Sequence, residues 1–394
     1  MSAPHRLTVE HLRLAQYRSY ALADVATGGA SVALHGPNGS GKTNLLEAVS
    51  MLTPGRGLRR AGADELARAP GGLGWKITAE VSGTEGMADV VTAVDSAEGT
   101  RRSVRIDEKQ ATQAALGRLV RAVWLTPAMD RLWAEAAGDR RRFLDRVTLG
   151  FFPAHGETSI AYERAMRERN RLLKEGIFDD AWLAALEAQM ARAGSTIARA
   201  RAVALARLIA AQETASAGSE KLFPKADLAI LGTMESRFGQ VIRESSDADD
   251  DLDALEGEEA AGLAQQLASG RPRDAAAGRT LTGPHRSDLE AIYAAKGMPA
   301  RTCSTGEQKA LLISLSLANA RALADQNGET PLVLLDEVAA HLDDGRRRAL
   351  YAEIQALGAQ AWMTGTGPEL FEGLADACHI AVSERDGTTE LDVV

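Results

Sequence analysis

The spacing of hydrophobic positions changes twice along the chain. Residues 7–126 alternate or run apolar in short stretches separated by Gly, Pro and Asp. This pattern predicts strands at 7–14, 20–25, 31–35, 75–82, 88–95, 103–107 and 122–126. One helix is expected among them, from Lys42 to about Leu52, because its apolar residues recur at helical spacing and Pro54 follows.

The middle of the chain has a helical period. Segments 157–174 and 181–215 predict an antiparallel helical pair, with a break at 176–180 and Asp180 as the N-cap of the second helix. Neither segment sustains the heptads of a long coiled coil. Residues 247–259 predict a solvated acidic loop or helix, and 270–278 (GRPRDAAAG) predict a linker.

Residues 279–394 return to an α/β pattern. Strands are expected at 288–294, 331–336, 361–364, 379–383 and 390–394, and helices at 306–325 and 344–357. We therefore expect one α/β domain in two sequence halves, 1–126 and 279–394. Residues 127–278, with the acidic segment 247–259, form a helical lobe inserted between them.

Composition and charge exclude several classes. Of the 394 residues 45% are hydrophobic and 25% charged, which excludes a disordered or fibrous protein. No apolar run approaches the roughly 18 residues of a membrane span. The charged N-terminus and two distant cysteines predict a cytoplasmic protein without a secretory signal, disulfide framework or zinc site. The net charge of −9 does not exclude nucleic acid, because outside 247–259 the chain has 46 acids and 45 bases.

A glycine-rich loop follows the strand expected at 31–35. Its residues Gly36-Pro37-Asn38-Gly39-Ser40-Gly41-Lys42-Thr43 match G-x-x-x-x-G-K-[ST] between an apolar strand and a helix. Glycines let backbone N–H groups face phosphate oxygens, and the helix N-terminus adds partial positive charge. Lys42 would supply a full charge to the β- and γ-phosphates, and the Thr43 hydroxyl would bind Mg²⁺. A chance glycine loop would lack this strand–loop–helix context.

The strand at 331–336 ends in two acids, Asp336 and Glu337. The carboxyl ends of parallel strands are where open α/β sheets bind ligands. Asp336 is expected to hold Mg²⁺, and Glu337 to orient and deprotonate a water that attacks the γ-phosphate. Alone, the pair would be explained as capping acids; with the phosphate loop it predicts the second half of a nucleotide site.

A third motif lies just before a long apolar helix. Ser304 and Glu307 have the spacing of a capping box, which is a complete structural explanation for both residues. The same helix N-terminus also offers a hydroxyl and N–H groups to a phosphate. Because Lys42 and its helix already serve one set of phosphates, we expect Ser304, Gly306, Glu307 and Gln308 to meet a nucleotide held by another subunit.

The order of these motifs, followed by His341-Leu342-Asp343, resembles the ABC-type ATPase heads. The resemblance implies ATP held between Lys42 of one protomer and Ser304 of the other, with Asp343 at the same seam. A head interrupted by helices is similar to the chromosome-maintenance and double-strand-break-repair branch. The expected fold is therefore an α/β ABC-type P-loop ATPase head, split in sequence, with an inserted helical lobe.

Further segments are similar to the RecF family of bacterial gap-repair proteins, over nearly the whole chain: 16–20 (QYRSY), 55–60 (GRGLRR), 138–145 (GDRRRFLD) and 280–288 (TLTGPHRSD). The resemblance implies an ATP-dependent DNA-binding clamp that dimerises with ATP and hydrolyses it weakly in response to DNA. It also implies roles in gap repair, replication restart and the SOS response, with RecR and RecO as partners.

Three positions depart from the family pattern. Ser287 stands where an acid is usual, and segment 126–130 (TPAMD) lacks the acid after its proline. Gly365-Thr366 replaces a histidine that many of these ATPases place near the γ-phosphate. Thr366 is a candidate substitute, and slow hydrolysis is expected.

Arginines beyond the phosphate-loop helix are the candidates for DNA contact: Arg56, Arg59 and Arg60. Binding through the DNA backbone would be sensitive to salt and independent of sequence. The arginines at 140–142 and 164–171 are equally well explained as solvated helix faces. Two other functions stay open: a stand-alone P-loop nucleotide hydrolase or kinase without a DNA role, and the ATP subunit of a transporter, for which coupling segments are missing.

Overall fold

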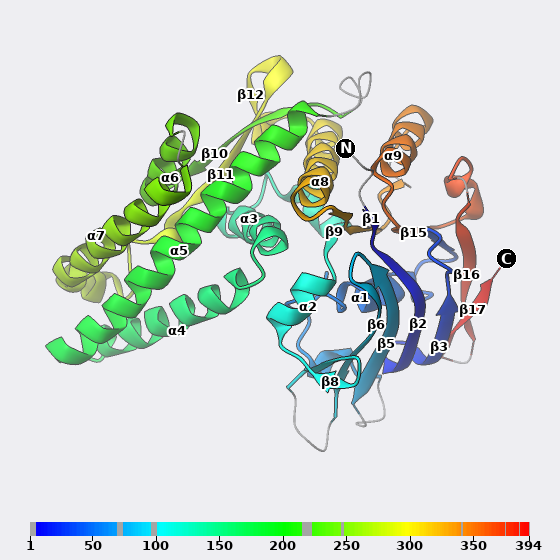
Figure 1. Ribbon diagram of the computed structural model, residues 1–394, viewed down its shortest axis with the longest axis horizontal. Helices are drawn as coiled ribbons and strands as arrows, with labels where there is room; N and C mark the ends of the chain where they lie inside the picture. Colours follow the sequence, from blue (N-terminus) through cyan, green and yellow to red (C-terminus); the bar gives the residue numbers. More distant parts are fainter. Residues whose placement is uncertain are drawn as a thin grey trace. The chain divides into compact units, whose positions relative to one another are not determined.

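The chain is described by a computed structural model that covers residues 5–68, 74–95, 101–214, 223–245, 248–339, 342–374, 376–385 and 387–393 (Figure 1). It forms two compact units. Unit 1 comprises Met1–Asp130, Thr214–Pro224 and Lys309–Val394, and unit 2 comprises Arg131–Glu213 and Lys225–Gln308. The last return of the chain to unit 1 is thus at Lys309, whereas the sequence placed the second half of the α/β domain from 279 onward. The reason is that the strands after 279 pair within unit 2. The assignment of these ranges to an ATPase head and a lobe stays a prediction.

Unit 1 contains a six-stranded sheet in the order β17-β16-β4-β15-β14-β9. Its strands are β17 (Thr388–Val393), β16 (Cys378–Arg385), β4 (Val32–His35), β15 (Ala361–Gly365), β14 (Leu332–Leu335) and β9 (Ala122–Leu125). All neighbours are parallel except β16 and β17. The four residues of β14 are all buried, as an apolar strand inside a parallel sheet requires. Because β4, β15 and β14 are neighbours, their carboxyl ends meet at one edge.

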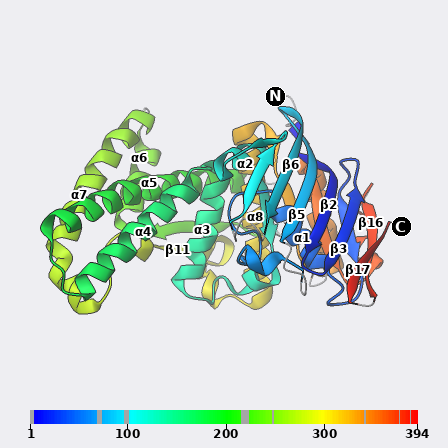
Figure 2. The same cartoon turned by 90° about the horizontal axis from the view of Figure 1, so that it is seen from below.

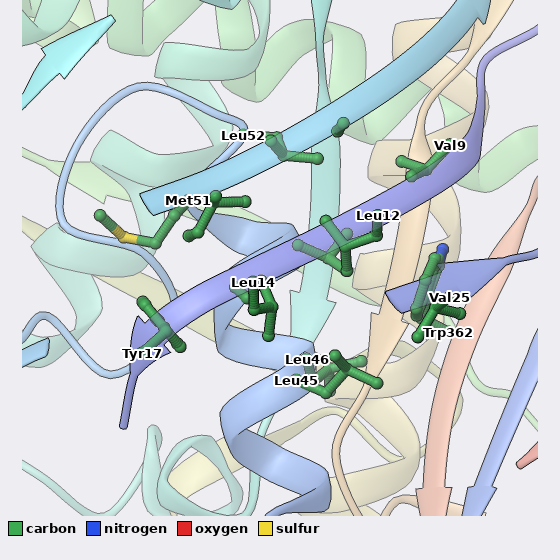
Figure 3. Packing of buried hydrophobic residues seen from close by; sticks show 14 of the residues in the cluster. Val9, Leu12, Leu14, Tyr17, Val25, Leu45, Leu46, Met51, Leu52 and Trp362 are labelled. Atoms are coloured by element: carbon green, nitrogen blue, oxygen red, sulfur yellow. The ribbon is translucent and has the colours of Figure 1, made fainter. Parts of the chain in front are cut away.

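A second sheet of unit 1 is antiparallel, in the order β3-β2-β5-β6-β7-β8. Its strands are β3 (Tyr20–Ala26), β2 (Thr8–Tyr17), β5 (Trp75–Gly83), β6 (Gly86–Val94), β7 (Ser103–Ile106) and β8 (Lys109–Gln110). The register of β2 against β5 shifts between Val9 and His11, so the inward residues are Val9, Leu12 and Leu14. They share a buried cluster with Leu45 of α1 (Lys42–Ser50) (Figure 3). This core fixes the helix that follows the phosphate loop.

The remaining elements of unit 1 are short or peripheral to that core. They are β1 (His5–Arg6), η1 (Asp64–Leu66), α2 (Gln113–Leu119), η2 (Pro127–Arg131), β13 (Glu329–Thr330), α9 (Asp344–Leu357) and η7 (Pro368–Phe371). Helix α8 (Thr305–Asn327) begins in unit 2 and continues in unit 1. The predicted strands and the helix from Lys42 are confirmed to within a few residues at their ends.

Unit 2 is mainly helical. Its helices are α3 (Ala137–Phe151), α4 (His155–Lys174), α5 (Asp180–Glu213), α6 (Thr233–Glu244) and α7 (Ala248–Ala277). Helix α4 packs along α5, which also packs against α6 and α7 (Figure 2). A small antiparallel sheet completes the unit, and its strands are β10 (Ala226–Leu231), β11 (Asp288–Tyr293) and β12 (Met298–Pro299). Three short turns accompany it: η3 (Pro284–Arg286), η4 (Ala294–Lys296) and η5 (Ala300–Thr302). The predicted helical pair is confirmed, but the sequence did not predict β10.

Two local predictions were wrong. The segment 270–278 is not a linker, because α7 continues to Ala277 with Pro272 inside it. Side chains on this stretch explain why: Arg271 pairs with Glu187 of α5 at 2.6 Å, so tertiary ion pairs outweigh the local break signals. Asp180 is not the N-cap of α5, since Asp179 Oδ1 accepts the Trp182 N–H at 2.9 Å. The acidic stretch from Asp249 to Glu259 is helical, and Asp247 lies outside the described residues.

In the described part of the chain, no helix combines the length and the apolar composition that crossing a membrane requires.

Candidate nucleotide-binding site

The loop after β4 needs glycine at defined positions. Gly36, Gly39 and Gly41 have φ of 151°, 85° and 105°, in the region that favours glycine. A Cβ atom at Gly36 would lie 2.1 Å from the carbonyl oxygen of Val382, and one at Gly41 would lie 2.6 Å from Thr389 Oγ1. The loop therefore has a backbone course that other residues at these two positions could not follow.

Polar groups of this loop are arranged as an anion site would require. Gly41, the N-cap of α1, supplies no side-chain cap to the first N–H groups of the helix. Lys42 Nζ donates to the carbonyl oxygens of Gly36 and Pro37, both at 2.7 Å, so the ammonium lies against the loop. Burial lowers the pKa of Lys42, and the charges of Glu337 and Asp336 oppose that shift. Ser40 Oγ is buried without a hydrogen-bond partner among the described residues.

A chain of hydrogen bonds joins α1, β14 and β15 at this edge of the sheet. Asp336 Oδ1 accepts from the Thr43 hydroxyl at 2.8 Å and from the Thr364 hydroxyl at 2.9 Å. The Thr364 hydroxyl in turn accepts the Glu337 N–H at 2.8 Å. The parallel sheet makes this possible, since β15 lies between β4 and β14. The structure thus brings together Lys42, Thr43, Asp336 and Glu337.

Thr364 is the residue of this site that the sequence did not single out. It is buried at the end of β15, where its hydroxyl bonds both acidic residues. One signal could have identified Thr364 from the sequence. It is a threonine near the end of a strand that lies between the strand before the phosphate loop and the strand before Asp336. Thr366, the predicted substitute for the missing histidine, is exposed. Glu337 has φ of 54°, a conformation unusual for a residue other than glycine, and its bonded N–H helps to hold it there.

The site also shows what a magnesium ion could use. Thr43 Oγ1 and Asp336 Oδ1 are hard oxygen donors already in contact, which fits the preference of Mg²⁺. Within the described ranges, no group of three or more His, Cys, Asp or Glu could hold a metal. A magnesium ion here would therefore need phosphate oxygens and water to complete its shell.

The arginines proposed for DNA contact lie in the loop after α1. Arg56 and Arg60 are exposed, and Arg60 has φ of 58°. Arg59 donates to Asn44 Oδ1 at 2.8 Å, so it is also bonded to the phosphate-loop helix. Arg102, which the sequence did not single out, fixes the loop by donating to the carbonyl oxygens of Met51, Thr53 (3.2 Å) and Gly55 (2.8 Å). Burial lowers the pKa of Arg102 to about 10.

The motif of Ser304, Gly306, Glu307 and Gln308 lies in unit 2, where η5 leads into α8. The predicted capping box is present: Glu307 Oε2 accepts the Ser304 N–H and the Ser304 hydroxyl, both at 2.8 Å. Ser304 and Gly306 are exposed, whereas Gln308 is buried and donates to the carbonyl oxygen of Cys303 at 2.9 Å. The Ser304 hydroxyl is thus at the surface of its own unit.

Asp343 lies in unit 1, at the N-cap of α9, and is exposed. Its Oδ1 accepts the Arg346 N–H at 2.9 Å, so it starts the helix as a capping residue does. His341 falls outside the described residues.

The structure accommodates two of the departures from the family pattern. Ser287 is buried, and its hydroxyl donates to Oε1 of Glu235 on α6 at 2.6 Å. A carboxylate at 287 would face Glu235. In segment 126–130, Asp130 accepts from Lys309 Nζ at 3.2 Å.

Comparisons with known proteins identify the family of the chain. The model of the RecF/RecN/SMC N terminal domain matches residues 8–390. The DNA replication and repair protein RecF of Rhizobium etli (strain CIAT 652) is 47% identical over 378 residues, which are 95% of this chain and 96% of that protein. The RecF of Brucella abortus (strain 2308) is 48% identical over 382 residues, 96% of each chain.

Solved structures show the same fold. The recombination mediator protein RecF-ATP in the RecFOR pathway superposes with a TM-score of 0.80 at 20% identity, over 100% of this chain and 99% of that one. The SmcHead bound to the C-winged helix domain of ScpA gives a TM-score of 0.52 at 16% identity, over 98% and 97% of the two chains. The fold is therefore an α/β ATPase head of the ABC type, and the chain belongs to the RecF family of DNA replication and repair proteins.

Proposed function

We propose that this protein is an ATP-switched DNA-binding clamp, in which two heads close around ATP and open after hydrolysis. The observation that carries the proposal is the hydrogen-bonded set Thr43–Asp336–Thr364–Glu337 beside the uncapped N-terminus of α1. It is supported by the RecF-ATP structure, whose fold this chain shares. ATP would bind along residues 36–43, with Lys42 against its phosphates.

Hydrolysis would depend on the two acids after β14. Thr43 and Asp336 would hold Mg²⁺, which would offset phosphate charge when bound. Glu337 would orient a water and take its proton, because its carboxylate follows the buried strand and acts electrostatically on Lys42. Thr366 is exposed, and the usual histidine is absent at 365–366, so we expect ATP turnover to be slow. We also expect DNA to stimulate this turnover.

Dimerisation would complete each site. The capping box at Ser304 is exposed and belongs to a different unit from Lys42. We therefore assign Ser304, Gly306, Glu307 and Gln308 to the γ-phosphate of ATP held by a second copy, with Asp343 at the same junction. ATP would then act by stabilising the closed dimer relative to the open one.

DNA and protein partners follow from the family. DNA would bind through its backbone, near junctions of single-strand gaps, with Arg56, Arg59 and Arg60 as candidate contacts. RecR and RecO are proposed as partners, as the RecFOR pathway named for the related structure suggests. The roles would be gap repair, replication restart and SOS induction, in the cytoplasm, where the DNA lies.

Sedimentation of Glu337→Gln with and without ATP and gapped DNA tests the proposal. The variant should bind ATP, hydrolyse it poorly and accumulate as a dimer, whereas Ser304→Arg should bind ATP and stay monomeric. A stand-alone nucleotide hydrolase would turn over rapidly as a monomer, and Ser304→Arg would not change it. A Glu337→Gln protein that is monomeric under every condition would exclude the clamp.

A further inference from the structure

The N-terminus of α8 carries a negative charge where the proposed function expects a phosphate. Glu307 Oε2 accepts the backbone N–H and the hydroxyl of Ser304, both at 2.8 Å. The carboxylate therefore lies against the residue assigned to the γ-phosphate. A phosphate bound beside Ser304 would be repelled by this carboxylate, and the helix N-terminus alone supplies only about half a charge to offset the repulsion.

One cation is placed to offset that carboxylate. Lys296 Nζ donates to Glu307 Oε1, while the Ser304 groups use Oε2. Lys296 ends the η4 turn that joins β11 to β12, and the pairing of Tyr293 with Met298 closes this hairpin. Its Nζ also lies 5.5 Å from the centre of the Tyr293 ring. The lysine is thus directed to Glu307 by a short, closed turn.

The titration of both groups agrees with this arrangement. The Lys296 hydrogen bond, followed by those from the Ser304 backbone and hydroxyl, lowers the pKa of Glu307 to about 2. The same pair raises the pKa of Lys296. Glu307 is therefore ionised at neutral pH, and a neighbouring cation reduces its repulsion of a phosphate.

We infer that Lys296 is a positioning residue that neutralises Glu307, so that the α8 N-terminus can receive the γ-phosphate of ATP bound by a second protomer. The inference rests on the proposed function. Lys296 bonds Oε1 of Glu307 and the Ser304 hydroxyl bonds Oε2, so Lys296 can keep its bond when the hydroxyl turns from Glu307 to a phosphate. Lys296 would thus affect dimerisation and leave ATP binding by the separate head unchanged.

The test measures the ATP concentration that gives half-maximal dimerisation, by sedimentation in the Glu337→Gln background. Lys296→Met should raise it about tenfold. Adding Glu307→Gln should restore it to within about twofold, because a glutamine still caps Ser304 but carries no charge. The Lys296→Met defect should also shrink at high salt. Lys225→Met is the matched control, since Lys225 forms a similar exposed pair with Glu213 at 2.8 Å.

Each outcome decides the inference. Normal dimerisation of Lys296→Met, or a defect equal to that of Lys225→Met, would overturn it. A defect that Glu307→Gln does not rescue would also overturn it, because Lys296 would then act independently of the carboxylate. Ser304→Arg distinguishes a failure of the proposed function from a failure of this inference: if Ser304→Arg dimerises normally, the proposed function fails. If it blocks dimers while Lys296→Met does not, only the inference fails. Unchanged ATP binding by the monomer is required of Lys296→Met and of Lys225→Met.

Discussion

Replacing Thr364 by valine removes one hydroxyl from the centre of the candidate site and keeps the shape of the side chain. Thr364 is buried at the end of β15. Its hydroxyl donates to Asp336 Oδ1 at 2.9 Å and accepts the Glu337 N–H at 2.8 Å. The substitution leaves a carboxylate oxygen with one fewer donor and a backbone N–H without its acceptor.

The cost follows from these two bonds. A hydrogen bond to a charged group contributes about 1.5–3 kcal/mol, and an N–H left unsatisfied costs about 1–3 kcal/mol. Asp336 keeps the Thr43 hydroxyl as a donor, so we expect Thr364→Val to lower the free energy of unfolding by about 3 kcal/mol. Thr364→Ser keeps the hydroxyl and loses one buried methyl group, which costs about 1 kcal/mol.

Urea unfolding of both variants provides the assay, with ATP turnover as a second measurement. Valine should be the less stable variant and should hydrolyse ATP more slowly, because Glu337 loses the bond that holds its backbone at φ of 54°. Serine should resemble the parent in turnover. If Thr364 only fills space, the order of stability reverses, since valine preserves the packing and serine does not. That reversed order would refute the role of the hydroxyl.

Two further predictions concern the helices of unit 2. Arg169→Met should lower the free energy of unfolding, measured by urea denaturation, by about 3–5 kcal/mol. The reason is that buried Asp274, which pairs with Arg169 at 2.7 Å, loses its cation. Adding Asp274→Asn should recover part of the loss. Burial opposes ionisation of Asp145, but His155 and Arg201 outweigh it and lower its pKa to about 2, from 3.8. The ionised Asp145 therefore contributes about 2 kcal/mol to the free energy of unfolding; this contribution is complete above pH 3.8 and is lost as the pH falls towards 2. The difference in stability between the parent protein and Asp145→Asn should accordingly shrink on acidification.

Motifs whose residues are neighbours in the chain could be predicted from the sequence. The phosphate loop is one example, because strand, glycines and helix follow each other over residues 31–50. The capping box of Ser304 and Glu307 is another, since both residues lie in one helical turn. In each case the local backbone sets the geometry, so the spacing of residue types is sufficient.

Contacts between distant segments could not be predicted in this way. Thr364 meets Asp336 only because β15 and β14 are parallel neighbours in register. Arg102 reaches the loop after α1 from a different strand region, and its sequence context contains no motif. The helix through 270–278 is likewise maintained by pairs such as Arg271–Glu187, whose members belong to different helices.

One oxygen atom connects the two halves of the nucleotide site. Asp336 Oδ1 accepts both the Thr43 and the Thr364 hydroxyls, and Thr364 holds the Glu337 N–H. If Thr43 turns to a ligand at the start of α1, this oxygen loses one of its two hydroxyl donors, and a Mg²⁺ ion held by Thr43 and Asp336 would take the place of that donor. A change at Thr43 can therefore reach the backbone of Glu337 through Asp336 and Thr364. Occupancy of the loop and the position of the proposed base are therefore linked by hydrogen bonds within unit 1 alone, before any second protomer arrives.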